Sequence, residues 1–186
     1  MPPKPKYERE KIIEIAVNLV REKGADALTA REMAVYLGTS SRPIFTAFEN
    51  MTELKKAVID RCNSIYEEYC NREVASNLYP EYKALGMAYI KLAIEESNIF
   101  KLLFMYENEN EYMDLQYKSV INIVQKQTGL GEQGADRMHF EMWAFVHGIA
   151  TMLATKYCEL DINTISDCLS DVYNGLKWRI DDGKNN

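Results

Sequence analysis

The stretch that decides the fold is residues 29–54, which read TAREMAVYLGTSSRPIFTAFENMTEL. Thr29 and Glu32 have the spacing of a capping box, in which the hydroxyl accepts from the third amide of a helix and the glutamate reaches back. Met33 and Leu37 then lie four residues apart and give this helix one apolar face. Gly38 follows at once, where the chain needs a left-handed backbone that only glycine adopts cheaply. The stretch therefore predicts a short helix followed by a tight turn.

A second helix follows this turn. Pro43 is tolerated only in a first turn, so the helix begins near Ser40 or Ser41, and the residues from Thr39 to Ser41 offer N-caps. Ile44 and Phe48 are four apart and point inward, and Asn50 with Glu53 caps a third, long helix. Two short helices joined in this way form a helix-turn-helix, which places its second helix in the DNA major groove, although an ordinary pair of core helices shares the pattern. The candidate DNA-binding residues here are Thr29, Thr39, Ser40, Ser41, Arg42, Pro43, Phe45 and Thr46.

Residues 9–56 resemble the N-terminal DNA-binding domain of the TetR/AcrR family of bacterial transcription regulators. Residues 98–104 are similar to a mid-chain segment of the family, and Trp143, His147 and Gly148 to a C-terminal pattern of one subgroup. The matching N-terminal segments are 12–20, Glu22-Lys23-Gly24, Leu28–Ala34, Gly38-Thr39-Ser40, Ile44-Phe45, Phe48 and Glu53-Leu54.

The chain departs from the family at three positions. The family commonly has a tyrosine at Phe45, a histidine near Ala47 and a lysine near Met51, and these residues usually contact phosphates. This chain therefore lacks one phenol donor and at least one cation. Binding to the DNA backbone is either weaker or supplied elsewhere.

Together the residues and the resemblance predict an all-α chain of about nine helices. We expect residues 1–50 to form the helix-turn-helix domain with a basic N-terminal arm, and residues 51–186 to form a helical effector-binding and dimerisation domain. The later helices are expected near residues 51–75, 79–97, 99–106, 111–128, 133–157 and 163–181, with breaks at Tyr79-Pro80, Asn98 and Gly129–Gly134.

Charge is distributed unevenly along the 186 residues, whose formal net charge is −6. Residues 1–50 hold eight Lys or Arg and seven Asp or Glu, whereas residues 51–186 hold 14 and 21. The acidity therefore belongs to the expected regulatory domain, and the N-terminal domain can still place cations at phosphates. Lys4 and Lys6 follow a proline-rich start, and this arm is either a DNA contact or a solubilising tail.

Composition also bears on location and chemistry. The chain shows no apolar run of membrane-spanning length and no signal-peptide core, so we expect a cytoplasmic protein without membrane contact.

The four cysteines have no metal-type spacing and are expected to be reduced, either buried or sensing redox state. His139 and His147 are eight apart without a carboxylate at metal-site spacing, so we expect no metal and no cofactor. No HExxH, GxSxG or phosphate-binding glycine motif appears, and we expect no enzyme activity.

The last two expected helices carry more apolar surface than one core requires. Helix 133–157 has two apolar stripes, and a second stripe is covered either within the chain or by a second copy. We expect a homodimer joined by a four-helix interface, because helix-turn-helix proteins read two half-sites through two-fold symmetry. The expected interface residues are Met138, Met142, Phe145, Ile149, Met152, Ile165, Leu169, Val172 and Leu176.

Aromatic and methionine side chains are concentrated between the helix-turn-helix and this expected interface. Tyrosines combine apolar faces with polar tips, which suits a pocket for an amphipathic small molecule, although core filling is the alternative. His147 is either a ligand anchor or a satisfied core histidine. The expected ligand-binding residues are Tyr66, Tyr69, Tyr89, Phe100, Phe104, Tyr112, Met113, Tyr117, Trp143 and His147.

The resulting hypothesis is a ligand-responsive repressor that binds a palindromic operator as a homodimer and is released by a small amphipathic or aromatic effector. The alternative is a dimeric helical ligand-binding protein whose DNA binding is weak or lost.

Overall fold

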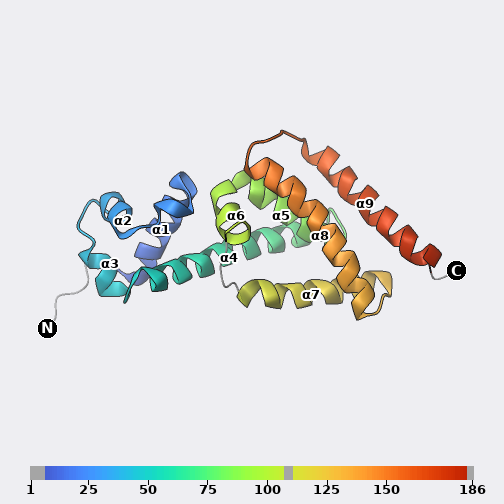
Figure 1. The fold of residues 1–186 in the computed structure, drawn as a ribbon, viewed down its shortest axis with the longest axis horizontal. Helices are drawn as coiled ribbons and strands as arrows, with labels where there is room; N and C mark the ends of the chain where they lie inside the picture. Colours follow the sequence, from blue (N-terminus) through green and yellow to red (C-terminus); the bar gives the residue numbers. More distant parts are fainter. Residues whose placement is uncertain (1–6, 107–110, 184–186) are drawn as a thin grey trace. The chain divides into compact units, whose positions relative to one another are not determined.

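The structure of the chain, a computed structural model, describes residues 7–106 and 111–183. These residues form nine α-helices, one short 3-10 helix and no strand, so the prediction of an all-α fold is confirmed (Figure 1). No helix among them is both long and apolar enough to cross a membrane. The helices are α1 (Arg9–Lys23), η1 (Ala25–Ala27), α2 (Ala30–Tyr36), α3 (Arg42–Ala47), α4 (Met51–Ala75), α5 (Glu81–Glu95), α6 (Ser97–Phe104), α7 (Glu111–Thr128), α8 (Glu132–Ala154) and α9 (Ile162–Gly183).

Several helix boundaries differ by a few residues from the sequence-based expectation, and two of these differences have a clear cause. The break expected at Asn98 lies at Glu96, because Asn98 belongs to the first turn of α6 and its side-chain amide donates to the Arg21 carbonyl at 2.8 Å. Helix α8 ends at Ala154 because Lys156 turns the chain with a φ of 56°. The Tyr157 amide then donates to the Met152 carbonyl at 2.9 Å, as in a Schellman motif. This end of the helix was not predicted because no glycine occupies the left-handed position.

The chain forms two compact units. The first comprises residues 1–66 and 96–108, and the second comprises residues 67–95 and 109–186. Helix α4 contributes to both units, so this division falls sixteen residues after Asn50 and also assigns α6 to the first unit. The division at Asn50 is one of function rather than of packing, and it stays a prediction.

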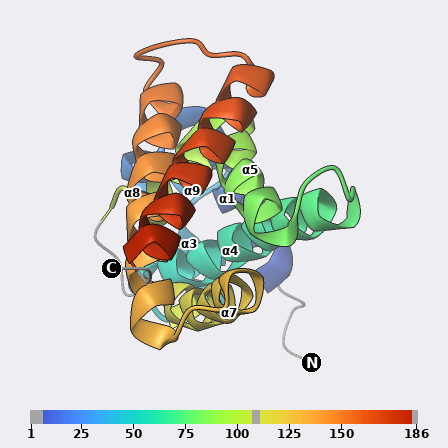
Figure 2. The same cartoon turned by 90° about the vertical axis from the view of Figure 1, so that its right-hand side faces the viewer.

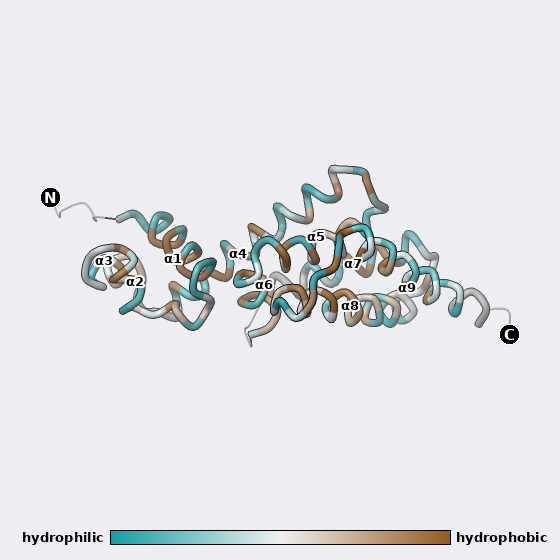
Figure 3. The backbone as a smooth tube through the Cα atoms, turned by 90° about the horizontal axis from the view of Figure 1, so that it is seen from above, coloured by the Kyte–Doolittle hydropathy of each residue, from teal (hydrophilic) through white to brown (hydrophobic). Residues whose placement is uncertain are grey.

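The first unit is built around α1. Every third or fourth residue of this helix is buried, and α1 contacts α2, η1 and α6. Figure 3 shows these apolar positions as brown turns between the teal, hydrophilic ones. Arg21 and the Glu96 carboxylate join α1 to the start of α6 through contacts of 3.0–3.1 Å. The buried residues of α1 are Ile12, Ala16, Val17, Leu19 and Val20.

The second unit is built around the packing of α5 on α8, with α7 and α9 beside them (Figure 2). Gly86 on α5 allows the close approach of α9, since a Cβ at this position would lie 3.2 Å from Leu169 Cδ2. In the N-terminal half of α8, Met138 packs with buried residues of α7. The buried members of this α7–α8 cluster are Val120, Ile121, Val124, Ala135 and Met138.

Candidate nucleic-acid interface

Helix α2 begins at the predicted cap. The Glu32 amide donates to Thr29 Oγ1 at 3.2 Å, which confirms one half of the capping box. The reciprocal half does not form, because the Glu32 carboxylate instead pairs with Lys23 at 2.9 Å. This hydrogen bond and charge hold the pKa of Glu32 below its ordinary value. The Tyr36 hydroxyl donates to Glu22 at 2.5 Å and ties the end of α2 to α1.

The turn between α2 and α3 has the predicted glycine. Gly38 has a φ of 63°, and the next amide, that of Thr39, donates to the Ala34 carbonyl at 3.0 Å. Ser41 precedes α3 in helical geometry, with φ −72° and ψ −7°, and its hydroxyl makes no capping bond. The expected serine cap is therefore wrong, since a capping side chain needs an extended backbone to reach the second or third amide. Pro43 lies in the first turn of α3, as predicted.

Helix α3 has one buried face and one exposed face. Ile44 and Phe48 point into the core with 0% and 2% exposure, as predicted. Arg42, Phe45 and Thr46 lie on the exposed side of the helix, and the Phe45 ring is 49% exposed. The Thr46 hydroxyl donates to the Arg42 carbonyl at 2.9 Å. A six-residue helix thus holds a cation, a phenyl ring and a threonine on one surface.

The corner between α3 and α4 is held by Arg9. Its guanidinium donates to the Ala47 carbonyl at 2.8 Å, pairs with Glu53 at 2.8 Å and lies 4.1 Å from the centre of the Phe48 ring. The Asn50 side chain caps α4 by accepting from the Glu53 amide at 3.0 Å. The Glu49 amide and Arg9 hold the pKa of Glu53 below its ordinary value. Arg9 therefore serves the fold of this domain.

Other cations of this region have no ion-pair partner among the described residues. Arg31 and Arg42 are exposed on α2 and α3. Lys55 and Lys56 are exposed in the second turn of α4, and sequence reasoning did not select them or Arg31. The two adjacent lysines just after the cap of α4 could have identified this position from the sequence as a candidate phosphate contact. The unpaired, exposed cations of the described part of residues 1–66 are Lys11, Arg31, Arg42, Lys55 and Lys56.

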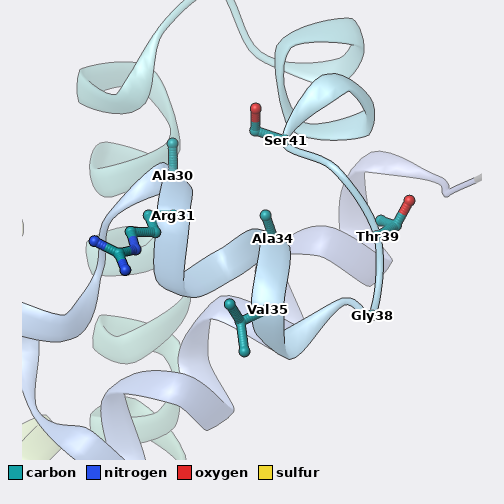
Figure 4. Close-up of a pocket in the computed structure, with 7 residues that line it drawn as sticks. All are labelled: Ala30, Arg31, Ala34, Val35, Gly38, Thr39 and Ser41. Atoms are coloured by element: carbon teal, nitrogen blue, oxygen red, sulfur yellow. The ribbon is translucent and has the colours of Figure 1, made fainter.

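A shallow hollow of about 660 Å³ lies on the outer surface of α2 and the following turn (Figure 4). Val35, which is 69% exposed, and Ala34 make its floor apolar. Arg31 extends from one side, and the hydroxyls of Thr39 and Ser41 lie toward the other (Figure 4). The complete lining is Ala30, Arg31, Ala34, Val35, Gly38, Thr39 and Ser41.

The described candidate DNA-binding residues lie at the N-cap of α2, on α3 or in the turn between these helices. Thr29, Ser40, Arg42, Phe45 and Thr46 are exposed, whereas Thr39, Ser41 and Pro43 are half-buried. Lys4 and Lys6 lie outside the described residues.

The candidate ligand-binding residues fall into both units. In the first unit, the Tyr66 and Phe104 rings meet edge to face at 5.4 Å, and Phe100 lies 5.2 Å from Phe104. Tyr66 and Phe100 are buried. These three side chains form part of the core of their unit.

In the second unit, two of the candidates meet on α8. His147 stacks on Trp143 at 5.0 Å, and its Nδ1 is hydrogen-bonded to the Tyr89 hydroxyl of α5 at 2.8 Å. Burial lowers the pKa of His147 and raises that of Tyr89. Gly148 beside it gives no close helix contact within one chain, since a Cβ there would meet nothing within 4 Å.

The remaining candidates of the second unit lie apart from this group. The Tyr69 hydroxyl donates to Glu95 at 2.7 Å. Tyr117 is 43% exposed and donates to Asp136 at 3.2 Å. The side chains of Tyr112 and Met113 lie outside the described residues.

Most of the candidate interface residues of α8 and α9 are buried within a single copy of the chain. Five of them are at most 6% exposed, so a second copy has no access to them in this conformation. The stripe assigned to a partner is therefore covered in large part by the chain's own helices, and the dimer interface stays a prediction. The five buried residues are Met138, Met142, Ile149, Ile165 and Leu169, and the half-buried ones are Phe145, Met152, Val172 and Leu176.

Large apolar side chains of the same two helices are exposed instead. Phe140 is 62% exposed, Trp143 41% and Trp178 69%. Gly148 on α8 and Gly175 on α9 also have open space where a Cβ would be. We call Phe140, Trp143, Gly148, Gly175 and Trp178 the exposed α8–α9 surface.

Comparison with known proteins supports the architecture. No family model matches the sequence, and the search of curated proteins found no match. Among solved structures, a TetR-like transcriptional regulator from Rhodococcus sp. RHA1 is 15% identical, with a TM-score of 0.68 over 92% of this chain and 94% of that one. A TetR-family transcriptional regulator from Vibrio parahaemolyticus is 14% identical, with a TM-score of 0.61 over 90% and 97%. SmeT, the repressor of the Stenotrophomonas maltophilia multidrug efflux pump SmeDEF, is 16% identical, with a TM-score of 0.50 over 78% and 80%. The chain therefore has the fold of the TetR-like transcriptional regulators.

Proposed function

We propose that this protein is a DNA-binding transcriptional regulator that represses its target genes as a homodimer. The observation that carries the proposal is the exposed side of α3, where Arg42, Phe45 and Thr46 face outward while Ile44 and Phe48 anchor the helix. A recognition helix needs this arrangement, since its base-contacting side chains must be free of the protein core.

Helix α2 and the turn support the same function. In a helix-turn-helix the first helix crosses the DNA backbone, so the hollow on α2 is where sugars and phosphates would lie. Arg31 offers a cation there, and Thr39 and Ser41 offer hydroxyls. Lys55 and Lys56 at the start of α4 add two further exposed cations. These groups would compensate for the missing phosphate contacts at Phe45, Ala47 and Met51.

Dimerisation belongs to the same proposal. A palindromic operator presents two half-sites about one helical turn apart, which requires two copies of α3. The exposed α8–α9 surface suits a partner because aromatic residues are enriched in interfaces and its glycines permit close helix approach. A bound dimer would repress transcription by blocking polymerase.

An effector would control this dimer through its second unit. The group formed by Tyr89, Trp143 and His147 combines aromatic faces with polar tips, which suits an aromatic or amphipathic molecule. A molecule that binds better to the state in which the two recognition helices are splayed would shift the population and release DNA.

The test is a gel-shift experiment with the full chain and random genomic fragments at several salt concentrations. We expect a fragment to be enriched, with an affinity that falls by about three orders of magnitude from 50 to 200 mM salt if six phosphates are contacted. No enrichment even at low salt would contradict the proposal.

The alternative is a dimeric helical ligand-binding protein without DNA binding. It is favoured by Phe45, Ala47 and Met51, which offer phosphates neither a side-chain donor nor a cation, and by Arg9, whose guanidinium is engaged within the domain. The same experiment separates the two functions, because only the regulator retards DNA.

A further inference from the structure

We propose that α3 reads the methyl groups of thymine bases in the major groove, through the Phe45 ring and the Thr46 methyl group. This inference rests on the proposed DNA-binding function and specifies which chemistry of the operator the helix recognises.

The first observation is the position of Phe45. Its ring is 49% exposed although the adjacent Ile44 is fully buried, so the ring is not needed for the core of the domain. Phenylalanine has no donor or acceptor, and it therefore forms no conventional hydrogen bond to a phosphate or to a polar base edge. On a DNA-facing helix, its favourable contacts are with apolar groups.

The second observation concerns Thr46. Its hydroxyl donates to the Arg42 carbonyl at 2.9 Å, within the same helix. A threonine hydroxyl engaged in this way leaves its methyl group as the remaining part of an exposed side chain. Two neighbouring positions of α3 thus present apolar groups.

The major groove gives these groups one specific partner. Thymine carries a C5-methyl group there, and none of the other three bases has a methyl group at its major-groove edge. Arg42 lies three and four residues before Phe45 and Thr46, so the three share one face of the helix. Arg42 is exposed and has no ion-pair partner among the described residues, and its guanidinium suits guanine O6 and N7. The helix therefore fits a half-site in which a guanine is followed closely by thymines.

Replacing thymine by uracil tests this directly, because it removes only the methyl group. The full chain first selects duplexes from a random-sequence pool, and each thymine of a selected duplex is then replaced singly by uracil. We expect a loss of affinity of about fourfold at one or two thymines per half-site, corresponding to one buried methyl group. Wild-type affinity that is unchanged by uracil at every thymine would overturn the inference.

Two variants assign the contacts. The affinity of Phe45→Ala should no longer depend on whether one particular position holds thymine or uracil. Thr46→Ser keeps the hydroxyl but removes the methyl group, and its affinity should become insensitive to the same replacement at a second position. Leu78→Ala is the matched control, because Leu78 is an exposed apolar residue that lies outside the helix-turn-helix and its hollow, and it should keep the full uracil pattern. If both α3 variants keep the wild-type pattern, other residues read the methyl groups and the inference is wrong. If the chain selects no duplex at all, the proposed function itself fails, which is a distinguishable result.

Discussion

Arg9 and Arg42 both belong to the helix-turn-helix domain but have different environments. Arg9 contacts Ala47, Glu53 and the Phe48 ring, whereas Arg42 has no ion-pair partner among the described residues. The sequence alone does not distinguish the two arginines, because a one-dimensional pattern does not show which acceptors fold back onto a cation. The same residue type therefore serves the fold at one position and a ligand at the other.

Substitution by alanine should separate these two roles. Arg42→Ala should change stability by less than about 0.5 kcal/mol, because the exposed Arg42 side chain has no ion-pair partner among the described residues, yet reduce DNA affinity about tenfold or more. Arg9→Ala should lower the free energy of unfolding by about 1 kcal/mol, since an exposed ion pair and a cation–π contact each contribute modestly. Urea titration and gel shifts measure the two effects. A stability loss in Arg42→Ala equal to that in Arg9→Ala would contradict the assignment.

The two histidines of the chain should make the stability depend on pH. Burial lowers the pKa of His139 and of His147 below the ordinary 6.5, while Asp136 partly opposes the shift of His139. Just below pH 6.5 the folded protein therefore binds fewer protons than the unfolded chain. The contribution of the two neutral histidines to stability is complete above pH 6.5, and it is lost as the pH falls from there through the lowered pKa values of the folded protein.

We expect the melting temperature to fall between pH 7.5 and 5.5, a range above the usual carboxyl pKa. His139→Gln should reduce this fall, because it removes one of the two titrating groups. Its Tyr82 partner, which is hydrogen-bonded to His139 Nδ1 at 2.9 Å, stays in place. Thermal melts at both pH values measure the difference, and an identical fall in the variant would exclude His139 as a source.

At the scale of the element, local rules explain most of the helix boundaries. Gly38 supplies the left-handed turn, and Thr29 and Asn50 supply caps as predicted. The end of α8 departs from these rules, since Lys156 adopts a left-handed conformation that glycine adopts more cheaply.

Lys156→Gly should therefore stabilise the protein by about 0.5–1 kcal/mol, because the left-handed conformation of a non-glycine residue costs roughly 1–2 kcal/mol and the larger backbone entropy lost by glycine offsets part of this gain. Lys156 is exposed and has no ion pair among the described residues, so the substitution removes no contact of this kind. Chemical denaturation measures the change. As a control, Thr155→Gly at the C-cap of the helix should destabilise, because it removes the hydroxyl that donates to the Thr151 carbonyl at 2.7 Å, and stabilisation by both substitutions would contradict the explanation.

At the scale of the whole molecule, α8 and α9 carry two kinds of apolar residue. Leu169 is 2% exposed and packs against α5 at Gly86, whereas Phe140 and Trp178 are exposed. Only the second kind is accessible to another copy of the chain.

Phe140→Glu with Trp178→Glu should produce a folded monomer, because both charges stay in water within one chain and oppose an apolar interface. Leu169→Glu should instead unfold the second unit, since it buries an unpaired charge. Light scattering with circular dichroism distinguishes the outcomes. A double variant that remains dimeric would place the interface elsewhere, and a folded monomer of Leu169→Glu would return it to the buried stripe.

The sequence by itself determined the features that depend on neighbours along the chain. Helical periodicity, the Thr29 and Asn50 caps, Gly38 and Pro43 defined the helix-turn-helix and the two faces of α3, because each acts within one or two turns. Only the tertiary structure decided how much of the apolar surface of α8 is buried within one chain, which cations are already engaged, and which candidate aromatics share a unit. These outcomes depend on which helices pack together, and a helix with apolar residues on two sides satisfies its own periodicity equally well in either orientation.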